Sequence, residues 1–300
     1  MTHYTDATNY SELFALGASE VVTDGKNRVA LWTQNTPKYN GGTIATIGGC
    51  ELEDSQDSIE LLSYASQYLS EKFTMVIGPM NGNTWLDYRL ITYSDGSPLF
   101  ALEPNTPPHW EKLFKLAGFE TLSEYSSSSI ELVKSSSSIT RLQNKLNQKG
   151  IKIRPMNSEQ FQQDLSSIYD LSVECFQKNF LYTDLPKESY MAKYQQVEAM
   201  LDPELILIAE KDGQPTGFVF CYPDQSNPQT LIVKTLASCP KKGFLGVGNL
   251  LVEAVHNIAL EKGFTQAIHA LQYMENSSLR ITSRYNPKVM RKYELLVKRF

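Results

Sequence analysis

Two stretches of the chain show the same alternation of apolar and polar positions. Glu20–Trp32 alternates around the dipeptide Asp24-Gly25, and Leu205–Phe220 does so around Asp212-Gly213. Asp-Gly readily adopts the positive φ angles of tight turns, so each stretch predicts a β-hairpin. The turns lie 188 residues apart, from Asp24 to Asp212. This spacing indicates an internal repeat with one copy in each half of the chain.

Each predicted hairpin is followed by a strand, an amphipathic helix and a second strand. Apolar residues recur at helical spacing through residues 59–73 in the first half and 250–259 in the second. This order of elements predicts a mixed α/β fold in both halves. The flanking strands are expected at Thr43–Cys50 and Thr74–Gly78, and at Leu231–Ala237 and Thr265–Leu271.

The second half has further elements. We expect a strand at Gly150–Arg154 and helices at Ser158–Phe176 and Pro186–Leu201, with Asn157 or Ser158 as the first helix cap. Met290–Lys298 alternates and is expected to be the last strand, with Tyr293 as a structural residue.

A serine-rich segment separates the halves. Ser126–Ser129 and Ser135–Ser138 bracket the short strand candidate Ile130–Val133, and we expect a solvated loop and linker there. Ile139–Gly150 follows as a connecting helix. The predicted domains are therefore residues 1–138 and 139–300.

Composition narrows the class of protein. With 41% hydrophobic residues among 300, the chain is not mainly disordered, and its net charge of −5 gives no footprint for nucleic acid or an anionic membrane. No apolar run approaches the roughly 20 residues that span a bilayer. The four cysteines and four histidines lack metal-ligand spacing, so no metal site is expected. We expect a cytoplasmic protein with neither nucleic-acid nor membrane partners.

One loop has phosphate-binding character. Cys239–Asn249 contains three glycines and two lysines between a predicted strand and a predicted helix. Glycines let backbone N–H groups converge on an anion at a helix N-terminus. The equivalent loop of the first half, Glu51–Asp57, carries four carboxylates and no glycine, so only the second half is expected to bind phosphate.

Other interpretations of this loop remain open. No Lys-Ser/Thr pair follows the last glycine, which argues against a P-loop. Gly246–Leu251 lacks the third glycine of a dinucleotide fingerprint. A tightly packed turn between strand and helix would account for the glycines as well as a phosphate site does.

From about Gly150 onward, the chain resembles the GCN5-related N-acetyltransferase (GNAT) family. The resemblance rests on Ile151–Pro155, Leu207–Phe218, the glycine loop and Asn276-Ser277-Ser278-Leu279. The first half looks like a degenerate copy, and its segments Gly78–Asn81 and Asn105–Pro108 are similar to a bacterial group of two-domain proteins in this family. The resemblance implies two tandem acyl-CoA N-acyltransferase-like domains.

The resemblance also implies a cofactor, acetyl-CoA or another acyl-CoA. Its pantetheine arm would pair with a splayed strand edge at Leu236 and Ala237, and Asn276 and Ser278 would touch the pantetheine or the sulfur end. The residues that would surround the pyrophosphate are Lys241, Lys242, Gly243, Phe244, Leu245, Gly246, Val247, Gly248 and Asn249. Lys241 or Lys242 would replace the Gln or Arg that usually opens this loop, where this chain has Gly243.

The sequence indicates the general acid and general base of an acyl transfer less clearly than it indicates the cofactor site. Family enzymes often place a tyrosine seven residues after the helix-opening asparagine, where this chain has Ser283. Tyr285, two residues later, is the alternative acid, because a phenol is far more acidic than a serine hydroxyl. Glu275 is the first candidate for base and Glu210 the second, while His269 is expected to be a packed histidine.

One further polar segment bears on the acceptor. Trp85, Tyr88 and Arg89 follow Gly78–Asn81 and would reach a cleft between the halves, although ordinary core aromatics and a surface cation are the favoured interpretation.

The resulting hypothesis is an N-acyltransferase that moves an acyl group, most simply acetyl, from acyl-CoA to a small-molecule or peptide amine by direct attack. The alternative is a non-catalytic acyl-CoA-binding or structural protein whose transferase chemistry has decayed. The sequence identifies neither the acyl chain, the acceptor nor the oligomeric state.

Overall fold

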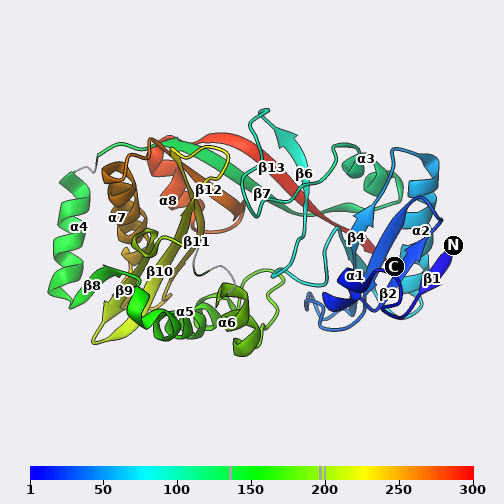
Figure 1. The fold of residues 1–300 in the computed structure, drawn as a ribbon, viewed down its shortest axis with the longest axis horizontal. Coiled ribbons are helices and arrows are strands. Elements are labelled where there is room, and N and C mark those ends of the chain that lie inside the picture. The colour runs from blue at the N-terminus through cyan, green and yellow to red at the C-terminus, as the bar shows by residue number, and fades with distance from the viewer. Residues whose placement is uncertain (135–136, 196–197, 199–200) are drawn as a thin grey trace.

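One mixed β-sheet runs through the whole molecule (Figure 1). The structure is a computed structural model that describes residues 1–134, 137–195, 198 and 201–300. Its strands lie in the order β1-β2-β3-β4-β5-β13-β7-β12-β11-β10-β9-β8, with β6 beside β13. Their bounds are β1 Thr2–Tyr4, β2 Glu20–Thr23, β3 Arg28–Trp32, β4 Ile44–Glu51, β5 Met75–Gly78, β6 Leu90–Ser94, β7 Glu120–Glu131, β8 Ile151–Pro155, β9 Ile206–Lys211, β10 Gln214–Pro223, β11 Thr230–Ser238, β12 Gln266–Tyr273 and β13 Lys288–Arg299.

The helices gather near the two ends of this sheet, and a narrower region of strands lies between them (Figure 1). Their bounds are α1 Ser11–Ala15, α2 Gln56–Ser70, α3 His109–Leu116, α4 Ser137–Gln148, α5 Phe161–Phe176, α6 Lys187–Gln195, α7 Val247–Glu261 and α8 Leu279–Thr282.

Both halves contain the succession of elements that the repeat predicts. Strands β2, β3 and β4 are antiparallel neighbours, and β5 joins β4 in parallel after helix α2. Strands β9, β10 and β11 are likewise antiparallel, and β12 joins β11 in parallel after α7. A parallel pair needs a crossover connection, which the amphipathic helix of each half supplies.

The last strand of each half lies in the other half. Strand β7 pairs with β12 and with β13. Strand β13, the C-terminal strand, pairs on its other side with β5 and β6 of the first half. The halves are thus joined by two exchanged strands at the middle of the sheet (Figure 1). The domain boundary predicted after residue 138 falls close to the start of α4 and stays a prediction.

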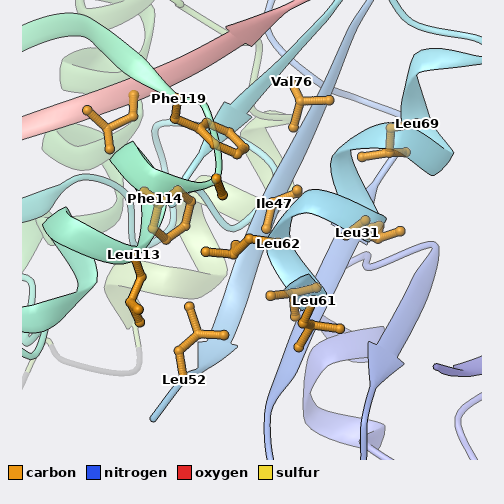
Figure 2. Packing of buried hydrophobic residues seen from close by; sticks show 14 of the residues in the cluster. Leu31, Ile47, Leu52, Leu61, Leu62, Leu69, Val76, Leu113, Phe114 and Phe119 are labelled. Carbon is orange, nitrogen blue, oxygen red and sulfur yellow. The ribbon is translucent and has the colours of Figure 1, made fainter. Parts of the chain in front are cut away.

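The core of the first half lies between α2, α3 and one face of the sheet (Figure 2). Ser55 begins α2 by accepting a hydrogen bond from the Ser58 backbone N–H, as N-cap serines do. The apolar stripe of the helix then packs on the strands. Buried members of this core include Leu31, Ile47, Leu61, Leu62, Leu69, Val76, Leu113 and Phe114.

In the second half, both faces of the sheet are covered. Val219 and Cys221 of β10 lie in the core under α7, while Phe218 and Phe220 point to the opposite face and pack with α5 and α6. Successive strand residues face opposite sides, so β10 serves two cores at once. The segment 242–261 meets the length and hydropathy criteria of a membrane-spanning helix, yet half of it is buried and its apolar residues form this core.

The serine-rich segment corrects the sequence analysis. Ser126–Ser129, expected in a solvated loop, lie inside strand β7 at the centre of the sheet. Ser127 is fully buried, and its hydroxyl accepts a hydrogen bond from the Leu271 backbone N–H and shares one with the Tyr293 hydroxyl, both at 2.9 Å. Bonds from neighbouring strands therefore satisfy this polar side chain. Of the second run, residues 135–136 lie outside the described residues and Ser137 begins α4.

Candidate active site

Strands β11 and β12 diverge halfway along their length. Their parallel ladder extends from Thr230 and Gln266 to Val233 and His269 and then ends. Beyond this point β11 continues beside β10 as far as Ser238, whereas β12, which pairs with β7 along its length, has a bulge between His269 and Gln272. Within the described ranges, β11 therefore has a free backbone edge over residues 234–238, where the resemblance predicts the splayed strands.

A cleft of about 1190 Å³ opens along this free edge. Its walls come from both halves of the chain: the segment 84–89 of the first half, helices α5 and α6, strands β10 to β12, and the segment 275–282. The lining is rich in aromatic side chains, which suits a long and partly apolar ligand. Those aromatic residues are Trp85, Tyr88, Tyr125, Phe161, Phe176, Phe180, Tyr182, Tyr190, Tyr194, Phe218, Phe220, Tyr222 and Tyr273.

The equivalent groove of the first half is filled by the chain itself. The ladder between β4 and β5 ends at Thr46 and Ile77. The Met80 backbone N–H then donates to the Ile47 carbonyl at 2.7 Å, and Asn81 Oδ1 accepts from the Gly49 N–H at 2.7 Å. The segment after β5 thus takes the backbone groups that a pantetheine arm would need. Among the described residues, the first half therefore has no free strand edge at this position.

The glycine loop leads from β11 to the N-terminus of α7. A short 3₁₀ turn at Lys242–Phe244 is followed by Gly246, whose φ of 96° is unfavourable for other residues. The first helical hydrogen bond in this turn runs from the Leu250 N–H to the Gly246 carbonyl at 3.0 Å. The N–H groups of Val247–Asn249 therefore lack partners within the helix and form the type of anion site found at helix N-termini.

The loop lies at the border of the cleft and does not line it. A Cβ on Gly248 would lie 3.4 Å from Ile281 Cδ1 and 3.7 Å from Leu236 Cδ2, and both of those residues line the cleft. Gly243 has open space around it. Gly248 thus lies next to two residues of the cleft lining, and the loop borders one end of the cleft.

The side chains of the glycine loop differ in their exposure and in their contacts. Lys241 forms an ion pair with Glu174 at 2.8 Å, which raises the lysine pKa. Lys242 and Leu245 are exposed, and Phe244 packs against the core of the second half. Asn249 Oδ1 is buried and has no hydrogen-bond partner among the described residues.

Three other residues suggested for the cofactor border the cleft. Leu236 lines it from β11, whereas Ala237 is buried in the core with Phe218. Asn276 Oδ1 accepts a hydrogen bond from the Ser278 N–H at 3.0 Å, and Ser278 Oγ accepts one from Gln272 Nε2 at 3.1 Å. The Asn276 and Ser278 side chains therefore hold the turn before α8 at the wall of the cleft.

A carboxylate and a phenol meet at the end of β12. The Tyr273 hydroxyl donates to Glu275 Oε2 at 2.9 Å, and its ring stacks on Phe180 with 5.3 Å between centroids. Burial, with the neighbouring Glu275 charge, raises the pKa of Tyr273 to about 12. The phenol therefore stays protonated and directs its hydrogen bond at Glu275. All three side chains line the cleft.

The residues suggested as general acid lie elsewhere. The Tyr285 hydroxyl donates to Glu253 Oε2 at 2.7 Å, and burial raises its pKa. Ser283 Oγ donates to the Arg280 carbonyl at 3.1 Å. Neither residue is part of the cleft lining, so this geometry gives no support for either as the acid. The second base candidate, Glu210 of β9, is bound to Arg154 of the edge strand β8 at 2.6 Å and also lies outside the lining.

Arg89 differs from its prediction. Expected to be a surface cation, it is 5% exposed and lines the cleft. Its guanidinium lies beside two phenol rings that are nearly perpendicular to each other, 3.8 Å from the centroid of Tyr88 and 4.0 Å from that of Tyr125. Its Nη1 donates to the Leu271 carbonyl at 3.3 Å. In the sequence, the aromatic and basic residues after Gly78–Asn81 were the feature that indicated this wall of the cleft.

Two lysines reach the same part of the cleft. Lys193 Nζ donates to the Trp85 carbonyl at 3.0 Å, and Lys234 Nζ donates to the Leu102 carbonyl at 3.1 Å. Desolvation lowers the pKa of both ammonium groups. For Lys234, the nearby positive charges of Arg89 and Lys193 contribute as well and bring the pKa to about 7.

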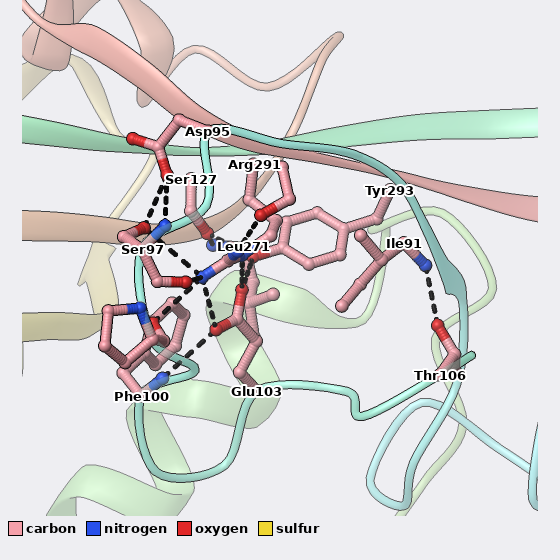
Figure 3. A network of polar contacts seen from close by, with 12 residues as sticks. Ile91, Asp95, Ser97, Phe100, Glu103, Thr106, Ser127, Leu271, Arg291 and Tyr293 are labelled. Atoms are coloured by element: carbon pink, nitrogen blue, oxygen red, sulfur yellow. Dashed lines mark hydrogen bonds and ion pairs between the residues drawn. The ribbon is translucent and has the colours of Figure 1, made fainter. Parts of the chain in front are cut away.

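A polar network beneath the cleft fixes this wall (Figure 3). Arg291 of β13 donates from Nε to Glu103 Oε1 at 2.8 Å, and both side chains are fully buried. The Tyr293 hydroxyl also bonds to Glu103 and to Ser127, whose hydroxyl accepts from the Leu271 N–H. The network thus connects the loop between β6 and α3 with the bulge of β12. Within it, Glu103 is paired with Arg291.

The overall architecture is shared with solved structures. A GCN5-related N-acetyltransferase from Sphaerobacter thermophilus aligns with a TM-score of 0.55 and 13% identity over 93% of this chain and 79% of that chain. A tandem GNAT protein from the clavulanic acid biosynthesis pathway aligns at 0.52 and 10% identity, over 93% and 82%. An acetyltransferase of the GNAT family from Colwellia psychrerythraea aligns at 0.50 and 11%, over 98% and 90%.

These likenesses concern the fold. No protein-family model matches the chain, and no curated protein matches it. The chain has the mixed α/β fold of GCN5-related N-acetyltransferases, which confirms the fold predicted from the sequence.

Proposed function

We propose that the chain is an acyl-CoA-dependent N-acyltransferase with one cofactor site, in the second half. The observation that carries this proposal is the free edge of β11, which opens into a cleft with a glycine loop at one border and the Tyr273–Glu275 pair in its wall. Such a cleft suits a ligand with a doubly charged middle and an extended amide arm.

In this proposal the loop residues 241–249 bind the pyrophosphate and the edge at Leu236 and Ala237 pairs with the pantetheine. Asn276 and Ser278 contact its sulfur end. The cofactor supplies an activated acyl group as a thioester. Acetyl-CoA is the simplest donor, and a cytoplasmic location remains a prediction of composition.

Glu275 is our candidate for the general base. A neutral acceptor amine attacks the thioester carbonyl carbon, the C–N bond forms and the C–S bond breaks. The proton that the nitrogen loses ends on the thiolate, so the products are an amide and free CoA. Glu275 would accept that proton, directly or through water, and Tyr273 would hold the carboxylate in position.

Cofactor binding tests this proposal first. Gly243→Glu places a carboxylate beside the loop, at a position with free space and an ordinary backbone conformation. Repulsion of the pyrophosphate should weaken CoA and acetyl-CoA binding in calorimetry by about 10- to 100-fold. Gly243→Ala, the matched neutral variant, should bind as the unaltered chain does. No heat with either cofactor would overturn the proposal.

A non-catalytic acyl-CoA-binding protein is the second candidate. The positions of Tyr285 and Ser283 outside the cleft favour it, because the acid expected from the resemblance is then missing. Free CoA release measured with and without an amine panel separates the two. Tight cofactor binding without turnover of any amine would favour the binding protein.

A further inference from the structure

Arg89 is a buried cation without an anionic partner. It is 5% exposed, and among the described residues no carboxylate lies within ion-pair distance of its guanidinium. The two phenol rings beside it, which are nearly perpendicular to each other, offset part of the desolvation, but a buried unpaired charge is still destabilising. Its Nε is buried and has no hydrogen-bond partner among the described residues, so this N–H is left for a ligand.

Lys193 and Lys234 extend this positive region. Each donates to a backbone carbonyl, and neither has an ion-pair partner within the part of the chain that is described. Two carboxylates lie near them. Asp87 is exposed, and Glu103 is held by Arg291, and neither forms an ion pair with the three cations among the described residues. Three positive side chains therefore face one part of the cleft without a matched anion.

These cations are separate from the pyrophosphate loop. Lys234 lies at the start of the free edge of β11, four residues before Ser238, where the strand ends. At about 3.3 Å per residue, the end of the strand is about 13 Å away, and the glycine loop lies beyond it. The cations therefore surround the end of the cleft where the acyl group and the acceptor would meet.

We propose that the acceptor is an amine that also carries a carboxylate or phosphate group, and that Arg89, Lys193 and Lys234 bind this anion. The inference rests on the proposed function and adds the chemical class of the acceptor. Arg89 would provide a directional, planar pair of donors, and the lysines would add charge. The aromatic lining beside them, Trp85 and Tyr190 included, would accommodate the carbon skeleton of the acceptor.

The proposal has a consequence for pH. The Lys234 ammonium, with a pKa of about 7, is only partly protonated at neutral pH, and the positive charges of Arg89 and Lys193 oppose its protonation, while Asp87 and Glu103 favour it. A bound anion favours the charged form, so binding takes up a proton. Affinity for the anionic acceptor should accordingly decrease as the pH rises above 7, and calorimetry in buffers of different ionisation enthalpy reports the proton uptake.

Matched acceptor pairs test the inference with the whole chain. Phenylalanine is compared with phenethylamine, and phosphoethanolamine with ethanolamine, with acetyl-CoA as donor. We expect kcat/KM to be at least about 100-fold higher for the acid-bearing member of at least one pair, because a site with a buried cation, Arg89, rejects a ligand that leaves this charge unpaired. The pair that responds identifies carboxylate or phosphate as the bound group.

Variants link the preference to the cations. Lys234→Met should reduce the preference for the acid-bearing amine by about tenfold or more and leave CoA affinity unchanged, and Arg89→Gln should do the same. Retained CoA binding shows that a variant is folded. Lys187→Met is the matched control, because Lys187 pairs with Asp170 outside the cleft, and it should change nothing.

Three results would overturn the inference. Equal turnover of neutral and acid-bearing amines would do so while leaving the proposed function intact. A loss in Lys234→Met confined to succinyl-CoA, with acetyl-CoA unaffected, would place the anion on the acyl group instead. The third result concerns the case in which CoA binds but no amine is turned over, so that the proposed function fails. Calorimetry then measures the affinity of the chain for each member of the matched pairs, and equal affinity within both pairs would overturn the inference.

Discussion

Glu275 and Tyr273 carry the proposed chemistry at the scale of single residues. Glu275→Gln keeps the shape and the hydrogen bond from Tyr273 but removes the basic oxygen. We expect kcat to fall by about 100-fold with KM for acetyl-CoA unchanged, because a positioned base contributes roughly that much. Steady-state kinetics with any accepted amine measure this. Glu210→Gln is the control, since that carboxylate is bound to Arg154 away from the cleft, and an equal loss there would contradict the assignment.

Two buried histidines make stability depend on pH. His256 Nε2 and His269 Nε2 lie 3.1 Å apart, and burial lowers the pKa of His256 to about 4 and that of His269 well below its usual value. Between about pH 4 and 6.5, the unfolded chain therefore binds more protons than the folded chain. The free energy of unfolding should decrease as the pH falls through this range.

The corresponding test compares variants across that range. Denaturant midpoints of His256→Gln should fall less steeply between pH 6.5 and 4.5 than those of the unaltered chain. Parallel slopes for the variant and the unaltered chain would show that the buried pair does not control the loss of stability at acid pH.

At the scale of secondary structure, local sequence patterns were sufficient to predict the positions of most helices and strands. The Asp-Gly turns, the strand–helix–strand order and the last strand all lie where the sequence placed them, because hairpin turns and amphipathic stripes are local signals. Asn157 caps the turn that precedes α5 by accepting from the Glu159 N–H. The loop predicted at Ser126–Ser129 was wrong because the burial of these residues is not a local property. Those serines are buried by strands β12 and β13, which lie more than 130 residues away in sequence.

The elements around the cleft were predictable to a similar extent. The glycine loop and the end of β12 carry recognisable residues, so their elements were placed correctly. The wall formed by Arg89 could not be evaluated from the sequence, because its burial depends on Tyr125 of β7 and on Leu271 of β12. The closed groove of the first half was hidden as well, since it depends on how Met80 and Asn81 fold back on β4.

The closed groove predicts that one CoA binds per chain. Since the β4 edge is already bonded to Met80 and Asn81, calorimetry should give a stoichiometry of one and not two. Asn81→Ala leaves the Gly49 N–H without its partner and should destabilise the protein by about 1–3 kcal/mol, measured by urea unfolding. Its stoichiometry should stay at one. A second site in the unaltered chain would contradict this account.

At the scale of the whole molecule, the exchange of strands makes the two halves dependent on each other. β5 and β6 of the first half pair with β13, and β12 of the second half pairs with β7. The cleft wall that contains Arg89 and Lys234 also needs both halves, since Arg89 comes from one and Lys234 from the other. A repeat found by local periodicity predicts two similar units, but it carries no information about which unit a final strand joins.

Expression of the halves as separate chains tests this dependence. The chain 139–300 lacks β7, so the edges of β12 and β13 would lose their shared partner and expose unpaired backbone groups. The chain 1–138 likewise lacks β13 beside β5 and β6. We expect each half alone to be aggregated or largely unfolded, as judged by size-exclusion chromatography and circular dichroism. Co-expressed halves should form a one-to-one complex that binds CoA with the affinity of the intact chain.

The alternative outcome is equally informative. If 139–300 alone were monomeric, folded and bound CoA normally, β13 would have to fold back beside β12 in place of β7. The cofactor site would then be independent of the first half, and the exchanged strands would serve to connect two self-sufficient units. Acceptor selectivity would still distinguish 139–300 from the intact chain. Because 139–300 lacks Arg89, it should lose the preference for acid-bearing amines even where CoA affinity is retained.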